Sequence, residues 1–74
     1  MSYVVVGTGA SGGRLYLHEV DFVGASWIDW SGGAAVFARA GEAHREMLRA
    51  EDGRPVFVRG LVGTVRAAHV ARAQ

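Results

Sequence analysis

Hydrophobic and polar positions alternate along the first third of the chain, which is the pattern of β-strands. The segment 3–6 (YVVV) is aromatic and β-branched, and the segment 14–23 (RLYLHEVDFV) alternates from one side of an extended chain to the other. The more apolar side of this second strand, which we expect to face the core, carries Tyr16, His18, Val20 and Phe22. A third strand is predicted over 26–30 (SWIDW), whereas 34–38 (AAVFA) fits either a helical turn or an extended segment.

One segment, 41–52 (GEAHREMLRAED), has the pattern of an α-helix. Its residues are strong helix formers, and its apolar positions recur at spacings of three and four. The apolar stripe consists of Ala40, Ala43, Met47 and Ala50, with His44 and Leu48 beside it. Gly53 ends the helix, and Pro55 prevents it from resuming.

The chain returns to a β pattern after the helix. Residues 56–58 and 61–70 are rich in β-branched side chains, and two interrupting glycines predict either one long bent strand or two strands. We expect a loose tail at 71–74. The order β-β-β-α-β predicts an α+β fold in a single domain, 1–74, with a small antiparallel sheet of about four strands and one helix packed across it.

The composition limits how such a domain is stabilised. The chain has 74 residues, half of them hydrophobic, and no cysteine, so packing or association with another chain must supply its stability. A homodimer is therefore one expected alternative. No apolar run approaches the roughly 20 residues that span a bilayer, and the N-terminus lacks the features of a secretory signal, so we expect no membrane partner and a cytoplasmic location.

The segment 7–13 (GTGASGG) contains the spacing G-x-G-x-x-G of dinucleotide-binding loops. In that fold the third glycine begins a helix that holds the pyrophosphate, inside a βαβ unit. Here the residues after Gly12 alternate like a strand, and Asp29, at a suitable spacing for a ribose, falls in another predicted strand. We therefore interpret the glycines as the loop of a β-hairpin and expect no cofactor.

The residue types that most often perform catalysis are scattered along the chain. His18, His44 and His69 fall in three different predicted elements and share no metal-ligand spacing, so we expect no metal site. Glu19 and Asp21 lie on one side of a predicted strand, but so small a domain rarely encloses the pocket that a pair of catalytic carboxylates needs. The sequence therefore predicts that the protein is not an enzyme.

The charges are unevenly distributed, although the net charge is only +1. All seven acids and three arginines lie between residues 15 and 53, whereas residues 54–74 carry four arginines and no acid. This asymmetry indicates either a charged partner or two solvated faces. A basic strand would suit nucleic acid, but no aromatic side chains are interleaved with it, so direct nucleic-acid binding is the less favoured alternative. Its cationic residues would be Arg59, Arg66, His69 and Arg72.

The two tryptophans are candidates for a protein interface. Trp27 and Trp30 would point to opposite faces of a strand, so that one packs under the helix and the other faces solvent beside Asp29. An exposed tryptophan next to a carboxylate is typical of an interface anchor. The alternative is that both rings fill the core of this small domain.

Three segments together resemble small phage-encoded anti-CRISPR proteins in their size and their layout of a β-sheet plus a helix: SWIDW at 26–30, AAVF at 34–37 and EAHREMLRAED at 42–52. The resemblance implies a stoichiometric inhibitor that binds a host CRISPR ribonucleoprotein and blocks target-DNA binding or nuclease recruitment in the host cytoplasm. The net charge argues against a complete mimic of DNA, which would be strongly acidic.

The residues expected to contact this partner are Asp21, Trp27, Asp29, Trp30, Glu46, Arg59 and Arg66. Two other functions stay open. One is a small nucleic-acid-binding or transcription-regulating protein that uses the basic C-terminal strand, and the other is a structural subunit that associates with copies of itself.

Overall fold

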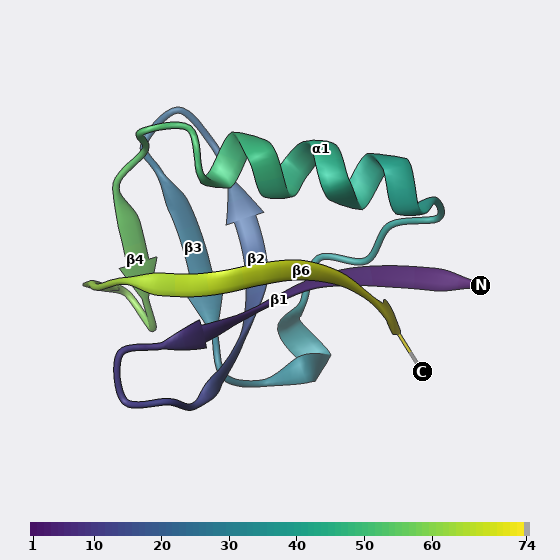
Figure 1. The fold of residues 1–74 in the computed structure, drawn as a ribbon. Helices are drawn as coiled ribbons and strands as arrows, with labels where there is room; N and C mark the ends of the chain where they lie inside the picture. Colours follow the sequence, from purple (N-terminus) through teal and green to yellow (C-terminus); the bar gives the residue numbers. More distant parts are fainter. Residues whose placement is uncertain (74) are drawn as a thin grey trace.

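The computed structural model describes residues 1–73 and arranges them as one sheet and one helix (Figure 1). The α+β class predicted from the sequence is confirmed. No helix within the described residues has the length and apolar character that crossing a bilayer requires. The elements in chain order are β1 (Ser2–Gly9), β2 (Arg14–Val20), β3 (Ala25–Ile28), the 3-10 turn η1 (Ser31–Gly33), α1 (Ala40–Ala50), β4 (Val56–Val58), β5 (Leu61–Val62) and β6 (Val65–Ala73).

The strands form one mixed sheet in the order β5-β4-β3-β2-β1-β6. Every neighbouring pair is antiparallel except β3 and β4, which run parallel because α1 lies between them in the chain and carries it back along the sheet. The expectation of about four antiparallel strands is therefore wrong in the number of strands and in this one pairing. The expectation of one long bent strand or two over 56–58 and 61–70 is also wrong, since three strands form there and β5 and β6 lie at opposite edges of the sheet.

The C-terminal strand β6 pairs with β1 from end to end, and Ser2 lies opposite Ala73. The prediction of a loose tail at 71–74 is therefore wrong for 71–73, which take part in this pairing, while residue 74 lies outside the described residues. Residues 71–73 are held in the sheet because β1 already begins at Ser2. The first residues of β1 are therefore available to pair with the end of β6.

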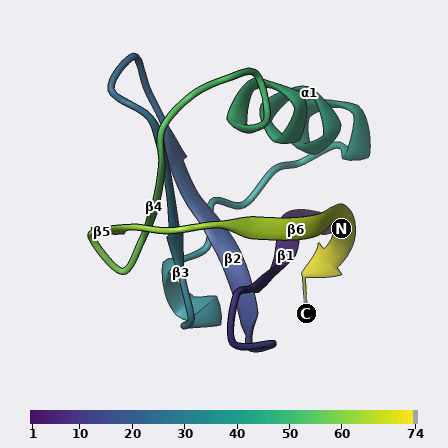
Figure 2. The ribbon, with the colours of Figure 1, turned by 60° about the vertical axis from the view of Figure 1, so that its left-hand side comes forward.

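The pairing of β1 with β6 contains a β-bulge. The register shifts between Val6 and Thr8, and on the opposite strand Ala67 adopts a positive φ of 55°. Bulges of this kind bend a strand and increase its twist. As a result β1 and β6 cross the direction of β2, β3 and β4 at a steep angle (Figures 1 and 2).

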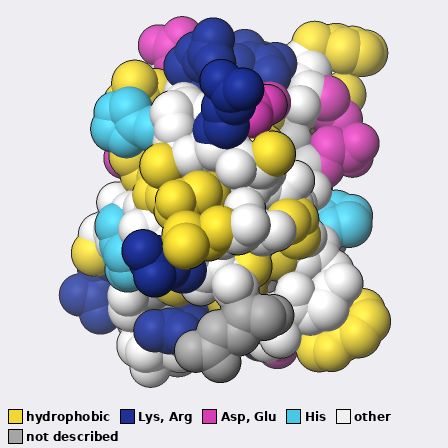
Figure 3. All heavy atoms as spheres, turned by 90° about the vertical axis from the view of Figure 1, so that its right-hand side faces the viewer, with side chains coloured by type: hydrophobic (Ala, Val, Ile, Leu, Met, Phe, Trp, Pro, Cys, Tyr) yellow, Lys and Arg dark blue, Asp and Glu magenta, His cyan; other side chains and the backbone are white. Residues whose placement is uncertain are grey.

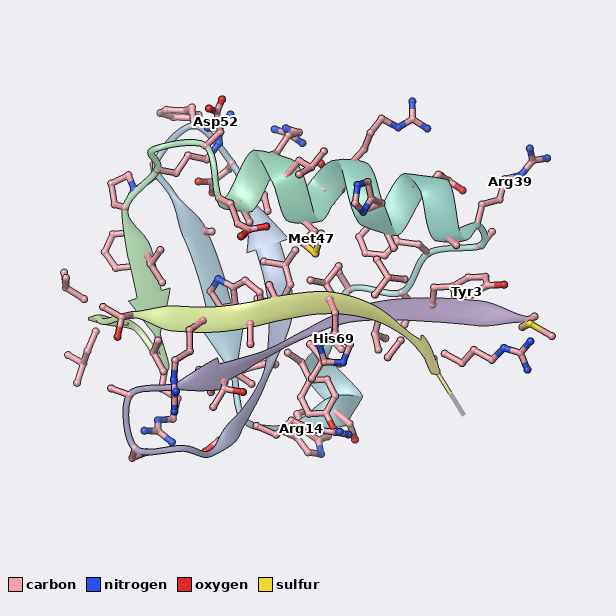
Figure 4. The ribbon with its side chains drawn as sticks, in the orientation of Figure 1. Tyr3, Arg14, Arg39, Met47, Asp52 and His69 are labelled. Carbon is pink, nitrogen blue, oxygen red and sulfur yellow. The ribbon has the colours of Figure 1, made fainter. Side chains whose placement is uncertain are left out.

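The core fills the space between α1 and one face of the sheet (Figure 2). Of the predicted helix stripe, Ala43, Met47 and Ala50 are buried, and Met47 points toward the strands (Figure 4), whereas Leu48 is half exposed. The stripe is thus confirmed at its centre. The buried core residues are Val5, Leu15, Leu17, Ala25, Trp27, Ala43, Met47 and Ala50.

The face of β2 that enters the core is the reverse of the prediction at the start of the strand, although Val20 at its end packs against the core as expected. Leu15 and Leu17 are buried under the helix, whereas His18 is exposed and the Phe22 side chain is 93 % exposed. The register shift between Leu17 and Glu19 interrupts the alternation, and Phe22 lies beyond β2 in the turn that leads to β3. Counting the apolar residues on each side of β2 therefore predicts the wrong buried face, because the two leucines at the start of the strand, Leu15 and Leu17, are the residues that enter the core.

The ambiguous segment 34–38 is extended, with no helical turn. β1 and β2 pair only near Val6–Thr8 and diverge beyond that point, and this segment enters the gap between them. Tyr3 and Phe37 exchange two backbone hydrogen bonds of 2.8 Å, and the Ala35 N–H donates to the Leu17 carbonyl oxygen at 2.9 Å. The segment therefore continues the sheet where the two strands have separated.

The glycine-rich segment is the loop of the β1–β2 hairpin. The Gly9 N–H donates to the Gly13 carbonyl oxygen at 2.8 Å, and β2 starts at Arg14. The chain that follows Gly12 is thus a strand antiparallel to β1, as the alternation of its residues predicted, and not the helix of a dinucleotide-binding fold.

Candidate functional site

Trp30 is the most exposed aromatic side chain at the end of β3. It follows the strand directly, lies at the start of η1, and its side chain is 68 % exposed. Its indole lies so close to Gly32 that a Cβ at this position would overlap the ring. Glycine at position 32 therefore lets the ring lie against the backbone of its own turn.

The backbone around Trp30 is fixed by several hydrogen bonds. The Trp30 carbonyl oxygen accepts from the Gly33 N–H at 3.1 Å, and the Gly33 carbonyl oxygen accepts from Nδ1 of His18 at 2.6 Å. The second bond ties the turn to β2. These hydrogen bonds hold the turn that carries the exposed indole, and we call it the braced turn. Because the backbone of this turn is already ordered, binding a partner would remove little further conformational entropy from it.

An ion pair involves Asp29, the residue that precedes Trp30 in the chain. Nη1 of Arg59 donates to Oδ2 of Asp29 at 2.8 Å, and more than half of each side chain is exposed. This hydrogen bond holds the pKa of the Asp29 carboxyl below its usual range. Because both groups face solvent, the pair leaves further donors on Arg59 and acceptor sites on Asp29 free to meet a partner.

The position of Arg59 follows from a tight turn. Arg59 and Gly60 both have positive φ, 51° and 80°, and connect β4 to β5 as the two central residues of a hairpin turn. Positive φ at both positions is the requirement of a type I′ turn. The Arg59 N–H also donates to the Trp27 carbonyl oxygen at 2.9 Å, which brings this turn to the end of β3.

Between this ion pair and the glycine hairpin lies a hollow of about 330 Å³. Its lining includes the hairpin loop, Arg14, Asp29, Arg59 and Thr64. The β1–β2 loop and the β4–β5 turn therefore meet at one end of the sheet (Figure 1), where Asp29 at the end of β3 also lines the hollow. We refer to Asp29, Trp30 and Arg59 as the turn-end site.

The structure brings together only three of the seven predicted contact residues, those of the turn-end site. Trp27 is 2 % exposed and belongs to the core, so its predicted role on the surface is wrong. The split between a buried and an exposed tryptophan was one of the two alternatives that the sequence left open. It follows from the odd spacing of the two residues along an extended chain.

Asp21, Glu46 and Arg66 lie elsewhere. Oδ1 of Asp21 accepts from the N–H groups of Val23 and Gly24 at 2.9 and 3.0 Å, so this carboxylate stabilises the β2–β3 turn, at the other end of β3 from Trp30. Glu46 forms an ion pair of 2.7 Å with Arg49 on α1, and Arg66 is exposed on β6. These three do not extend the turn-end site.

Sequence analysis missed a second exposed apolar group at the β2–β3 turn. Phe22 lies at the tip of this turn, next to Val23, whose side chain is also exposed. The signal was present in the sequence, because an aspartate followed three residues later by glycine is typical of a turn. A turn predicted at this position would have placed Phe22 outside the strand and therefore outside the predicted core.

Titratable and metal-binding groups are dispersed over the part of the chain that the structure describes. Within residues 1–73 no group of three or more His, Cys, Asp or Glu side chains is gathered where it could hold a metal ion. Comparisons with protein-family models, with curated proteins and with solved structures find no match to this chain.

Proposed function

We propose that the protein is a non-enzymatic interaction module that binds a protein partner through the turn-end site. The observation that carries the proposal is Trp30, a large aromatic residue that is 68 % exposed on a turn held by an internal hydrogen bond and by one from His18. Tryptophan is enriched among the residues that dominate binding energy in interfaces. A rigid turn reduces the conformational entropy that binding removes.

The Asp29–Arg59 pair supports the same surface. An acid and an arginine beside an exposed indole offer both a carboxylate and a guanidinium to groups at the rim of an interface. Such charges orient the partner and favour association more than they add affinity. We expect their loss to slow binding without abolishing it.

As the partner we propose a CRISPR ribonucleoprotein of a host cell, the class implied by the resemblance to phage-encoded anti-CRISPR proteins. The module would act stoichiometrically in the host cytoplasm, by covering the surface that receives target DNA or the nuclease. The absence of a strong net negative charge favours occlusion of a protein surface over imitation of DNA.

The test is a binding assay with guide-loaded CRISPR effector complexes, followed by a target-DNA mobility shift. We expect the protein to co-elute with one complex and to block its DNA binding or nuclease recruitment, and Trp30→Ala to weaken binding by about tenfold to a hundredfold. The matched control is Phe22→Ala, which removes a still more exposed aromatic side chain at the other end of β3. Equal losses in both variants, or no complex bound, would contradict the proposal.

A second candidate function is nucleic-acid binding by β6. The observation that favours it is the edge position of this strand, on which Arg66, His69 and Arg72 are exposed, with no acid between residues 54 and 73. A nucleic-acid binder would shift free DNA or RNA with a steep dependence on salt, and Arg66→Gln would reduce that slope. An inhibitor of the proposed kind would ignore free DNA.

A further inference from the structure

A second hollow, of about 550 Å³, lies on the face of the sheet away from α1. Val4 and Val6 form part of it, and they alternate along β1 with Val5, which packs into the core on the helix side. We refer to it as the back hollow. Its lining side chains include Val4, Val6, Arg14, Tyr16, Val36 and Arg72.

The divergence of β1 and β2 explains why this hollow exists. The two strands pair near Val6–Thr8 and separate beyond, and the segment 35–37 is inserted between them. The turn η1 contributes Ser31 and Gly32 on one side, and the end of β6 contributes Ala71 and Ala73 on the other. The hollow is thus built by the course of the backbone and does not depend on a mobile loop.

The back hollow has a mixed polar and apolar lining, in which Val4 and Val6 are apolar members. Val4 and Val6 are only 7 % and 3 % exposed although no helix covers this face. The exposed Val36 lies at the rim. Figure 3 shows one end of the molecule: hydrophobic side chains gather across its middle, basic and acidic side chains lie above them, and basic side chains lie below.

The charge around this hollow has one sign. The only charged residues in the lining are Arg14 and Arg72, and neither has an ion-pair partner within residues 1–73. Arg14 lies on the side of β1 and β6 away from α1 (Figure 4). Hydroxyl groups of Tyr16 and Ser31 add neutral donors.

We propose that the back hollow binds a small organic anion with an apolar body and one carboxylate or phosphate group. The apolar body would lie on Val4 and Val6, and the anionic group would meet Arg14 and Arg72, whose planar guanidinium groups suit either oxyanion. The volume falls in the range of about 300–1,000 Å³ that is usual for small-ligand pockets. This site adjoins the interface proposed above, because Ser31 and Gly32 of the turn that carries Trp30 line it, but it does not require that interface.

The hollow beside the glycine hairpin fits such a ligand less well. It also contains Arg14, but its other arginine, Arg59, is paired with Asp29, and that carboxylate lines the same space. An anion placed there would approach a negative charge. Among residues 1–73, no acidic residue lines the back hollow.

The test is a titration followed by NMR amide spectra, with phenyl phosphate and phenylacetate as the two probes. We expect saturable shifts at Val4, Val6, Tyr16 and Ser31, and none at the β2–β3 turn. The probe that binds more tightly identifies the anionic group. The spectra also report whether each variant remains folded.

The variants are Arg14→Gln and Arg72→Gln, with Arg39→Gln as the matched control, since Arg39 is an exposed arginine outside the hollow. We expect each of the first two to weaken binding of the better probe by about tenfold, the size of one charged hydrogen bond, and the control to leave it unchanged. A second test, Val36→Glu, places a carboxylate at the rim and should weaken binding at least as much. Absence of saturable shifts with both probes, or equal loss in Arg39→Gln, would overturn the proposal.

Discussion

Gly7 and Trp27 face each other in the interior of the domain: a Cβ on Gly7 would lie 3.2 Å from Cζ3 of the Trp27 ring and would overlap Cγ1 of Val65. The glycine lies in β1, opposite the bulge in β6, and it lets the indole pack directly against the backbone. The large indole ring on β3 therefore fills the core at this point, and it fits there because β1 has no side chain at position 7.

The first prediction concerns this contact. Gly7→Ala inserts a methyl group into a filled space, and we expect it to lower the free energy of unfolding by about 2 kcal/mol. Urea denaturation followed by circular dichroism measures the change. The control is Gly13→Ala, where a Cβ would meet no atom within 4 Å; a loss as large in the control would show that the close packing at Gly7 is not the cause.

The second prediction concerns the indole nitrogen of Trp27, which is buried without a hydrogen-bond partner. A buried unpaired donor costs free energy, and phenylalanine removes the donor while it keeps most of the ring. We expect Trp27→Phe to remain within about 1 kcal/mol of the natural protein, whereas Trp27→Ala should cost about 3–5 kcal/mol through the cavity that it leaves. Comparable losses in the two variants would indicate that the nitrogen is satisfied in solution.

The third prediction concerns the bulge residue Ala67, whose φ of 55° is strained for any residue with a Cβ. Ala67→Gly relieves this strain, and the gain exceeds the entropy that glycine loses on folding, so we expect a stabilisation of about 0.5–1 kcal/mol. Ala71→Gly, in the regular part of the same strand, is the control and should destabilise by a similar amount. Thermal unfolding of the two variants should shift in opposite directions.

The fourth prediction concerns the pH dependence of the Asp29–Arg59 pair. The pKa of Asp29 is lower in the folded protein than in the unfolded chain because Arg59 donates a hydrogen bond to the carboxylate. The contribution of the pair to stability is therefore present above the unfolded pKa and is lost as the pH falls through the folded pKa. Both groups are exposed, so added salt should also weaken it.

The measurement for this pair is an NMR titration of the Asp29 carboxyl group. Arg59→Gln should raise the pKa of Asp29 toward its usual range, while Arg66→Gln, which changes a distant arginine, should leave it unaltered. If Asp29 titrates identically in the natural protein and in Arg59→Gln, the 2.8 Å contact does not persist in solution.

The elements that could be predicted from the sequence are those determined by local preferences. The helix stripe around Ala43 and Met47 and the hairpin at 7–13 depend on residues close together in the chain, and both are confirmed. Trp27 and Trp30 are three positions apart, so in an extended chain they point to opposite faces. Because Trp27 is buried in the core, Trp30 is exposed. Local spacing was therefore sufficient for these features.

The features that were mispredicted, or that the sequence left open, depend on contacts between distant segments. The parallel pairing of β3 with β4 and the inclusion of 71–73 in the sheet were mispredicted, and the insertion of the extended segment 35–37 between two diverging strands was left open; each involves partners far away in the chain. The same holds for the turn-end site, because Arg59 reaches Asp29 only through the fold. No pattern within one segment indicates which strand will lie beside it.

The pairing of Ser2 with Ala73 places the start of β1 beside the end of β6 at one end of the sheet. A short linker could therefore join them, and the chain could be opened instead within the glycine hairpin, to give a circularly permuted protein with the same strand order. For the same reason the whole domain can be grafted into a surface loop of a carrier protein, with Trp30 still presented on its braced turn.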